Sequence, residues 1–81
     1  MSKINEMIEA VNANIKKLAI CGYVVEKIGD LTANRAEVVY SNPVMGDGFT
    51  HTVVFTRRKA HYGKEWIMEM DYDSHPENKK G

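Results

Sequence analysis

The feature that most constrains this chain is a change in the spacing of its apolar residues at Gly22. Before Gly22, apolar residues recur every three or four positions, which is typical of a helix with one buried face. After Gly22, apolar and polar residues alternate, which is the period of a half-buried strand. The spacing therefore predicts one N-terminal helix followed by strands. The predicted apolar stripe of the helix consists of Ile4, Met7, Ile8, Val11, Ile15, Leu18 and Ala19.

Both ends of the predicted helix carry suitable capping residues. Ser2 precedes the stripe, and its hydroxyl can accept a hydrogen bond from a free amide of the first turn. Gly22 follows the stripe, and glycine commonly ends a helix because it adopts a left-handed backbone without steric penalty. We therefore expect the helix to begin after Ser2 and to end before Gly22.

Turn-forming residues divide the rest of the chain into four short predicted strands. Residues 23–28, 36–41, 49–56 and 65–72 are the strands, and residues 57–64 form a polar loop between the last two. Short connections favour antiparallel neighbours, and one helix covers only one face of a sheet. The predicted fold class is α+β: an N-terminal helix packed on one face of a four-stranded antiparallel meander (α-β-β-β-β), with the other sheet face open.

The alternation also predicts which strand residues face the helix. Val39, Val54 and Ile67 alternate out of phase with the apolar residues around them, so they are expected to form an apolar row on the open face. In the first strand both alternations contain a charged residue, Glu26 or Lys27, so its buried face stays undecided. The residues expected beneath the helix are Ala36, Val38, Tyr40, Phe49, Val53, Phe55, Trp66, Met68 and Met70.

Length and composition limit the remaining possibilities. The chain has 81 residues, which is enough for one hydrophobic core. We expect a single domain over residues 1–72 and a polar C-terminal tail over residues 73–81. The single cysteine, Cys21, cannot close an intramolecular disulfide, and no apolar run reaches the length of a membrane-spanning helix. The expected location is the cytoplasm, without membrane contact.

Charge is balanced over the whole chain but uneven along it. The sequence has 11 basic and 11 acidic residues, a total that argues against a general polyanion binder. Residues 35–63 nevertheless carry an excess of basic residues, and residues 64–81 carry an excess of acidic residues. The predicted loop combines basic and aromatic side chains that suit phosphates and unpaired bases. The candidate nucleic-acid-binding residues are Arg57, Arg58, Lys59, Tyr62 and Lys64.

The sequence contains only weak indications of a metal site or a catalytic site. Asp71, Asp73 and His75 would share one face of an extended strand, and His61 or Glu69 would complete a metal site. This spacing matches no established metal motif, so no metal is expected. No catalytic triad, paired carboxylates or cofactor fingerprint is present, and we expect neither a cofactor nor an enzyme.

Two further side chains have simple structural interpretations. Cys21, at the end of the helix, is expected to be a small buried residue rather than a reactive thiol. His51 lies among the apolar positions of the third strand, where a hydrogen-bonded histidine at the core or its rim is expected.

These observations favour a small non-enzymatic binding module that acts through protein–protein contact. It would regulate or inhibit a larger protein, as bacterial or phage accessory proteins do, or form a homodimer through its open sheet face. The alternative is a nucleic-acid-binding protein that uses residues 57–64. The predicted protein-binding residues lie on the open face and in the turn before the third strand: Val39, Val54, Ile67, Met45 and Asp47.

Overall fold

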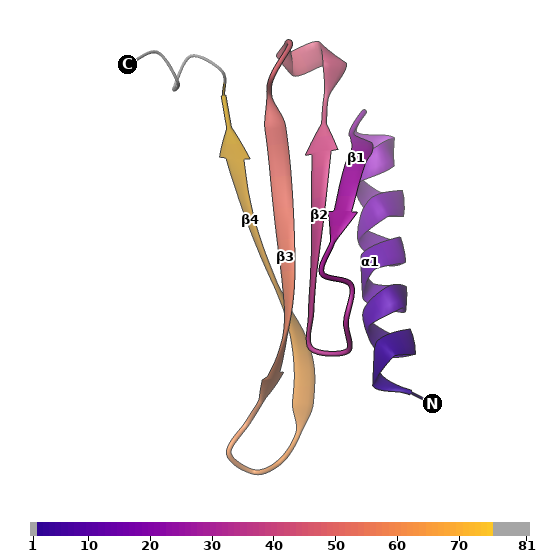
Figure 1. The fold of residues 1–81 in the computed structure, drawn as a ribbon, viewed down its shortest axis with the longest axis vertical. Helices are drawn as coiled ribbons and strands as arrows, with labels where there is room; N and C mark the ends of the chain where they lie inside the picture. The colour runs from indigo at the N-terminus through magenta and orange to yellow at the C-terminus, as the bar shows by residue number, and fades with distance from the viewer. Residues whose placement is uncertain (1, 76–81) are drawn as a thin grey trace.

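One helix packs against one antiparallel sheet, as the sequence predicts (Figure 1). The computed structural model describes residues 2–75. Its four strands are neighbours in chain order, so each connection joins two adjacent strands. The elements are α1 (Lys3–Ile20), β1 (Val24–Gly29), β2 (Arg35–Ser41), the short 3-10 helix η1 (Pro43–Met45), β3 (Thr50–Lys59) and β4 (Glu65–Ser74).

Both predicted helix caps are confirmed. The Ser2 hydroxyl accepts a hydrogen bond from the Asn5 amide at 3.3 Å. Gly22 has a φ of 93°, in the left-handed region that favours glycine. This conformation lets the Tyr23 amide donate to the Leu18 carbonyl at 3.1 Å, which closes the helix and turns the chain toward β1.

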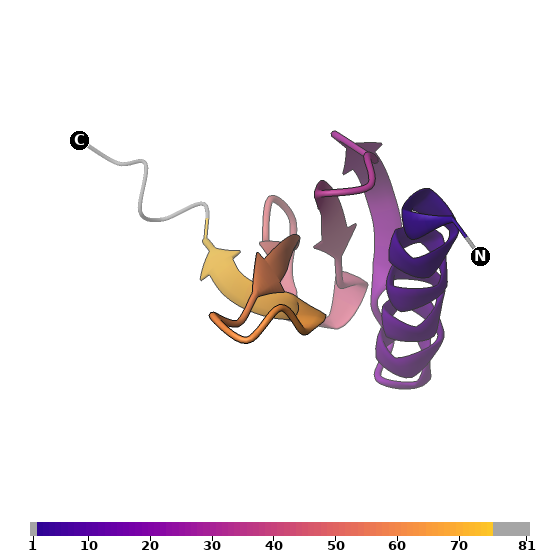
Figure 2. The ribbon, with the colours of Figure 1, turned by 90° about the horizontal axis from the view of Figure 1, so that it is seen from below.

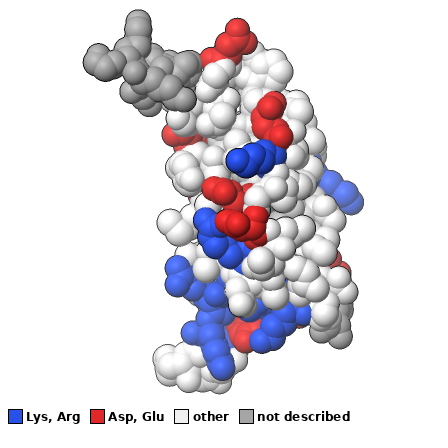
Figure 3. Space-filling view, in the orientation of Figure 1, with Lys and Arg blue, Asp and Glu red and all other residues white. Residues whose placement is uncertain are grey.

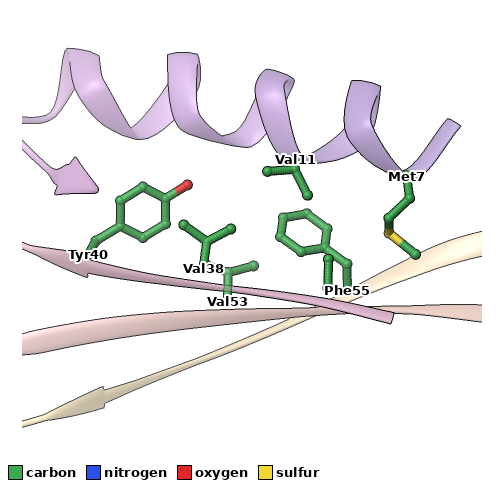
Figure 4. Packing of buried hydrophobic residues seen from close by; sticks show 7 residues of the cluster. Met7, Val11, Val38, Tyr40, Val53 and Phe55 are labelled. Atoms are coloured by element: carbon green, nitrogen blue, oxygen red, sulfur yellow. The ribbon is translucent and has the colours of Figure 1, made fainter. Parts of the chain in front are cut away.

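The core lies between α1 and the central strands (Figure 4). The helix contributes Met7 and Val11, and the sheet contributes Val38, Tyr40, Val53 and Phe55, together with Ala36. In Figures 1 and 2, α1 lies beside β1 and β2, and β4 is the strand farthest from it. The β3–β4 side of the sheet therefore receives less cover from the helix than the β1–β2 side.

A chain of hydrogen bonds crosses from this core to β4. Asn14, which is buried on the inner face of α1, accepts a hydrogen bond from the Tyr40 hydroxyl at 2.6 Å. The same Asn14 donates through its amide to Glu69 on β4 at 3.4 Å. Burial, together with the Glu69 carboxylate, raises the pKa of Tyr40 to about 12. The sequence did not predict that Asn14 is buried. The buried face of the helix was assigned from the spacing of apolar residues, and asparagine is polar.

A bulge in β1 explains why neither alternation of this strand is clean. The register shifts between Val25 and Lys27, so Val25 lies opposite Tyr40 while Ile28 lies opposite Val38. Val25 and Ile28 therefore both face the helix. Glu26 turns to the other side, where its carboxylate accepts a hydrogen bond from Ser41 at 2.7 Å. One extra residue thus places two consecutive charged side chains on the open face.

The predicted orientation of β4 is wrong. Phe55, whose side chain is in the core, lies opposite Glu69, and Val53 lies opposite Asp71. Residues paired across a sheet point to the same face, so the helix-facing residues of β4 include Ile67, Glu69, Asp71 and Asp73. Trp66, Met68 and Met70, expected beneath the helix, lie on the open face instead. Both alternations of this strand contain apolar residues, so the β3 register, rather than hydrophobicity, decides its orientation.

Several predicted boundaries also move. β3 continues through Lys59, so the polar loop covers only residues 60–64, and Arg57 lies within the strand. β4 continues to Ser74, two residues into the predicted tail, and residues 76–81 of that tail lie outside the described residues.

Cys21 is exposed, so the prediction of a buried cysteine is wrong. Among residues 2–75, no helix combines the length and hydropathy that crossing a membrane requires.

We predict that Tyr40→Phe lowers the free energy of unfolding by about 1–3 kcal/mol, because the buried Asn14 oxygen loses its donor. Urea denaturation at neutral pH measures this loss. The unfolded tyrosine ionises near 10 and the folded one near 12, so the stabilisation is complete below about pH 10. This stabilisation is lost as the pH rises from about 10 through 12. The difference in the free energy of unfolding between the native protein and Tyr40→Phe should therefore narrow over that pH range.

Tyr62→Phe is the matched control, because Tyr62 is 73% exposed. This substitution should change the free energy of unfolding by no more than about 0.5 kcal/mol. Equal effects of the two substitutions would contradict the role assigned to the Tyr40 hydroxyl.

Candidate functional site

The open face of the sheet carries a row of large apolar side chains along β4. Trp66 is 48% exposed, Met70 is 55% exposed and Tyr72 is 56% exposed, while Met68 between them is half-buried. These four residues, here called the β4 apolar row, alternate along one strand and therefore share one face. β4 is also an edge strand, so its outer side has no neighbouring strand among the described residues (Figure 1).

Two of the three residues predicted for the open face border this row. Val54 lies on β3 directly opposite Met70, and Val39 lies on the same face one strand further, opposite Thr52. Both are half-buried. Ile67 does not join them, because it points to the helix side and packs against the core. The predicted open-face position of Ile67 is therefore wrong, and the β4 apolar row takes its place.

A cavity of about 560 Å³ opens on the same face, beneath the segment that joins β2 to β3. Val39 and Phe49 contribute apolar lining, and Asp47 and Lys27 contribute charge. Two predicted residues, Val39 and Asp47, therefore meet at one depression. Met45 is outside its lining and stands 51% exposed on η1.

Arg57 has a structural role that the sequence did not indicate. Its side chain is only 7% exposed. The guanidinium donates to the Ala33 carbonyl at 2.9 Å and to the Lys3 carbonyl at 2.8 Å. It also pairs with Glu6 at 3.0 Å and with Glu65 at 3.4 Å. Arg57 thus joins the start of α1, the turn before β2 and the start of β4, and its donors are not directed at a phosphate.

The other predicted basic residues remain accessible at the end of the β3–β4 hairpin. Arg58, Lys59 and Lys64 are exposed and form no ion pair with any residue from 2 to 75. Tyr62, at the tip of the same hairpin, is 73% exposed. Figure 3 shows Lys and Arg side chains gathered at the lower end of the molecule, where Figure 1 places this hairpin.

Glu65 lies beside this basic end and is engaged within it. Lys3 donates to its carboxylate at 3.2 Å. This hydrogen bond, with the charges of Lys3, Arg57 and Lys59, holds the pKa of Glu65 below its usual value. The carboxylate therefore stays ionised to a lower pH than a free glutamate does.

Carboxylates predominate at the opposite end of the sheet. His51 lies between two of them, with Nδ1 at 2.5 Å from Asp73 and Nε2 at 3.6 Å from Asp71. The His51 side chain is 12% exposed, which confirms its predicted position at the core or its rim. His75 lies instead against the Phe49 ring, with ring centroids 5.0 Å apart. Within the described part of the chain, no cluster of three or more His, Cys, Asp or Glu residues is suited to hold a metal ion.

Comparison with known protein families, with curated proteins and with solved structures finds no match to this chain.

We predict that Arg57→Ala destabilises the fold by about 2–4 kcal/mol, because it leaves two backbone carbonyls and two carboxylates without their shared donor. Chemical denaturation measures the change. Arg58→Ala is the matched control: this neighbouring side chain is exposed, and its loss should change stability by no more than about 0.5 kcal/mol. Equal stability of both variants would contradict the structural role of Arg57.

Proposed function

We propose that this chain is a small, non-enzymatic binding module that acts through protein–protein contact at its open sheet face. The observation that carries the proposal is the β4 apolar row, with Trp66, Met70 and Tyr72 each about half exposed. Tryptophan, tyrosine and methionine are enriched at protein interfaces. Adjacent exposed side chains of this kind are rare on surfaces that bind nothing, because water solvates them poorly.

The surroundings of the row also suit a protein interface. Thr52, Val54 and Thr56 on β3 face Tyr72, Met70 and Met68. They give the row a border of small side chains, of which Thr52 is buried and Val54 and Thr56 are half-buried. The location of the row on regular strands holds the contact residues in fixed positions, which reduces the entropy lost on binding.

The proposal of a non-enzymatic role is supported by the way the reactive side chains are engaged. Nδ1 of His51 is hydrogen-bonded to Asp73, and its Nε2 lies 3.6 Å from Asp71. Arg57 donates to backbone and carboxylate oxygens within the fold. Contacts of this kind within the fold support a structural role for these two side chains.

We predict that Met70→Glu abolishes partner binding without unfolding the chain, because it places a charge in the middle of the row at an exposed position. The measurement is affinity capture with the tagged chain as bait in an extract of its native host. Circular dichroism and thermal unfolding check that the variant is folded.

Ile20→Glu is the matched control, since Ile20 is also exposed but lies at the end of α1, away from the open face. It should capture the same proteins as the native chain. If Met70→Glu captures them equally well, the open face is not the binding surface.

A second candidate function is nucleic-acid binding at the hairpin end, where Arg58, Lys59 and Lys64 form no ion pair with the residues that the structure describes and Tyr62 is exposed. Arginine and lysine neutralise phosphates, and an exposed tyrosine can stack on an unpaired base. We predict that any binding to single-stranded RNA or DNA at low salt is lost when these three basic residues become alanine. Fluorescence anisotropy over a salt series measures it.

The control for that experiment is Lys16→Ala with Lys17→Ala, which removes exposed positive charge from the helix instead. Absence of binding by the native chain to any nucleic acid at low salt would eliminate this second function.

A further inference from the structure

We propose that a second copy of this chain covers the β4 apolar row, with the two open faces packed together and the two β4 strands running in opposite directions. This inference rests on the proposed function and names its partner. Four features carry it: the acidic side of β4, the symmetry of the row, the opposite charges at the two ends of the sheet, and the neutral total charge.

The acidic side of β4 argues against pairing of two chains edge to edge. Glu69, Asp71 and Asp73 project from the helix-facing side of this strand. If two copies of β4 paired antiparallel about Glu69, Glu69 would lie opposite Glu69 and Asp73 opposite Glu65 of the other copy, where like charges destabilise a sheet. Charged residues of this kind commonly protect an exposed edge. The apolar side chains of β4 are therefore available to a partner above the sheet rather than beside it.

The order of residues in the row suits contact with its own copy. A two-fold axis that lies between the faces, perpendicular to β4 and level with Glu69, reverses one strand relative to the other. Because the row residues are evenly spaced, Trp66 then lies over Tyr72 of the second copy, and Met68 lies over Met70 of the second copy. Aromatic side chains meet at both ends, and flexible methionines fill the centre. Most small assemblies use such a two-fold interface.

The charges at the ends of the sheet favour the same direction. Arg58, Lys59 and Lys64 lie at the hairpin end, without ion pairs in the described part of the chain. Asp47 lies toward the other end, in the turn before β3, and lines the cavity on the open face. Reversing one copy brings the basic end of each chain over the acidic end of the other (Figure 3). A parallel arrangement would place the two basic ends together.

The total charge is compatible with self-association. The chain carries equal numbers of basic and acidic residues, so two copies do not repel each other as whole molecules. Four partly buried side chains offer less area than the roughly 800 Å² per partner of a standard interface. We therefore expect a reversible dimer with a dissociation constant on the order of 10 μM.

Sedimentation velocity tests the dimer over chain concentrations from about 1 μM to about 1 mM, which bracket the expected dissociation constant. We expect the average mass to rise from one chain to two. Trp66 is the single tryptophan, so its fluorescence reports on the row directly. Its emission should shift to shorter wavelength with concentration, because the indole leaves water as the dimer forms.

Two substitutions connect the dimer to the row. Met70→Glu should raise the dissociation constant at least about tenfold and remove the concentration-dependent shift in Trp66 emission. Ile20→Glu, exposed but on α1 and so away from the open face, should leave both unchanged. A dimer that survives Met70→Glu overturns the assignment to this face.

Arg58→Glu tests the direction of packing. In the antiparallel dimer it weakens association, because it removes a positive charge that faces the acidic end of the other copy. In a parallel dimer the two Arg58 positions would meet, and the same substitution would leave the two ends less repelled. Stronger association of Arg58→Glu therefore overturns the antiparallel arrangement.

A chain that remains monomeric up to about 1 mM overturns the second-copy inference outright. The proposed function fails separately, when Met70→Glu captures the same host proteins as the native chain. The two experiments therefore distinguish a module that binds itself from one that binds another protein.

Discussion

The pairing register between β3 and β4 is the constraint on which the surface of this molecule depends. Phe55 faces the core and lies opposite Glu69, so every residue of β4 is assigned to a face by its β3 partner. That assignment places carboxylates on one side of the strand and Trp66, Met68, Met70 and Tyr72 on the other. A slip of one residue would exchange the two sets, turning the carboxylates to the open face and the apolar row to the helix side.

Several interactions hold this register from the helix side. Asn14 reaches Glu69, His51 lies between Asp71 and Asp73, and Arg57 pairs with Glu65. Polar contacts of this kind need their partners at defined positions, whereas apolar side chains can slide past one another. The acidic residues of β4 thus align the strand and keep its edge charged. The fold and the candidate interface are therefore two results of one arrangement of residues.

Hydrophobic periodicity alone predicts the helix, its caps, the four strands and their order. It succeeds for β2 and β3 because in these strands one alternation is clearly apolar at Ala36, Val38, Val53 and Phe55. It fails for β4. The large apolar side chains of the tryptophan and the methionines favoured the wrong face, whereas Ile67 on the other face is the residue that packs against the core. Both alternating sets of residues in this strand contain apolar side chains. Hydrophobicity therefore does not predict which set faces the core, because polar contacts decide it.

Two further features lie beyond any local pattern. The β1 bulge depends on how Val25 and Ile28 pair with β2, so a rule that requires strict alternation cannot find it. Arg57 belongs by sequence to a run of basic residues, but its partners are far away in the chain. Only the folded arrangement separates this buried arginine from its exposed neighbour Arg58.

The contacts of Arg57 also bear on how the chain folds. Its guanidinium holds the backbone carbonyl of Lys3, 54 positions earlier in the chain, and the carboxylate of Glu65 on the last strand. The first turn of the helix therefore reaches its native environment only after the hairpin near the other end has formed. Such non-local contacts slow folding, since long loops must close before any contact compensates for their lost entropy. During synthesis β1 and β2 can cover part of the apolar stripe first, whereas the first turn of the helix must wait for β3 and β4.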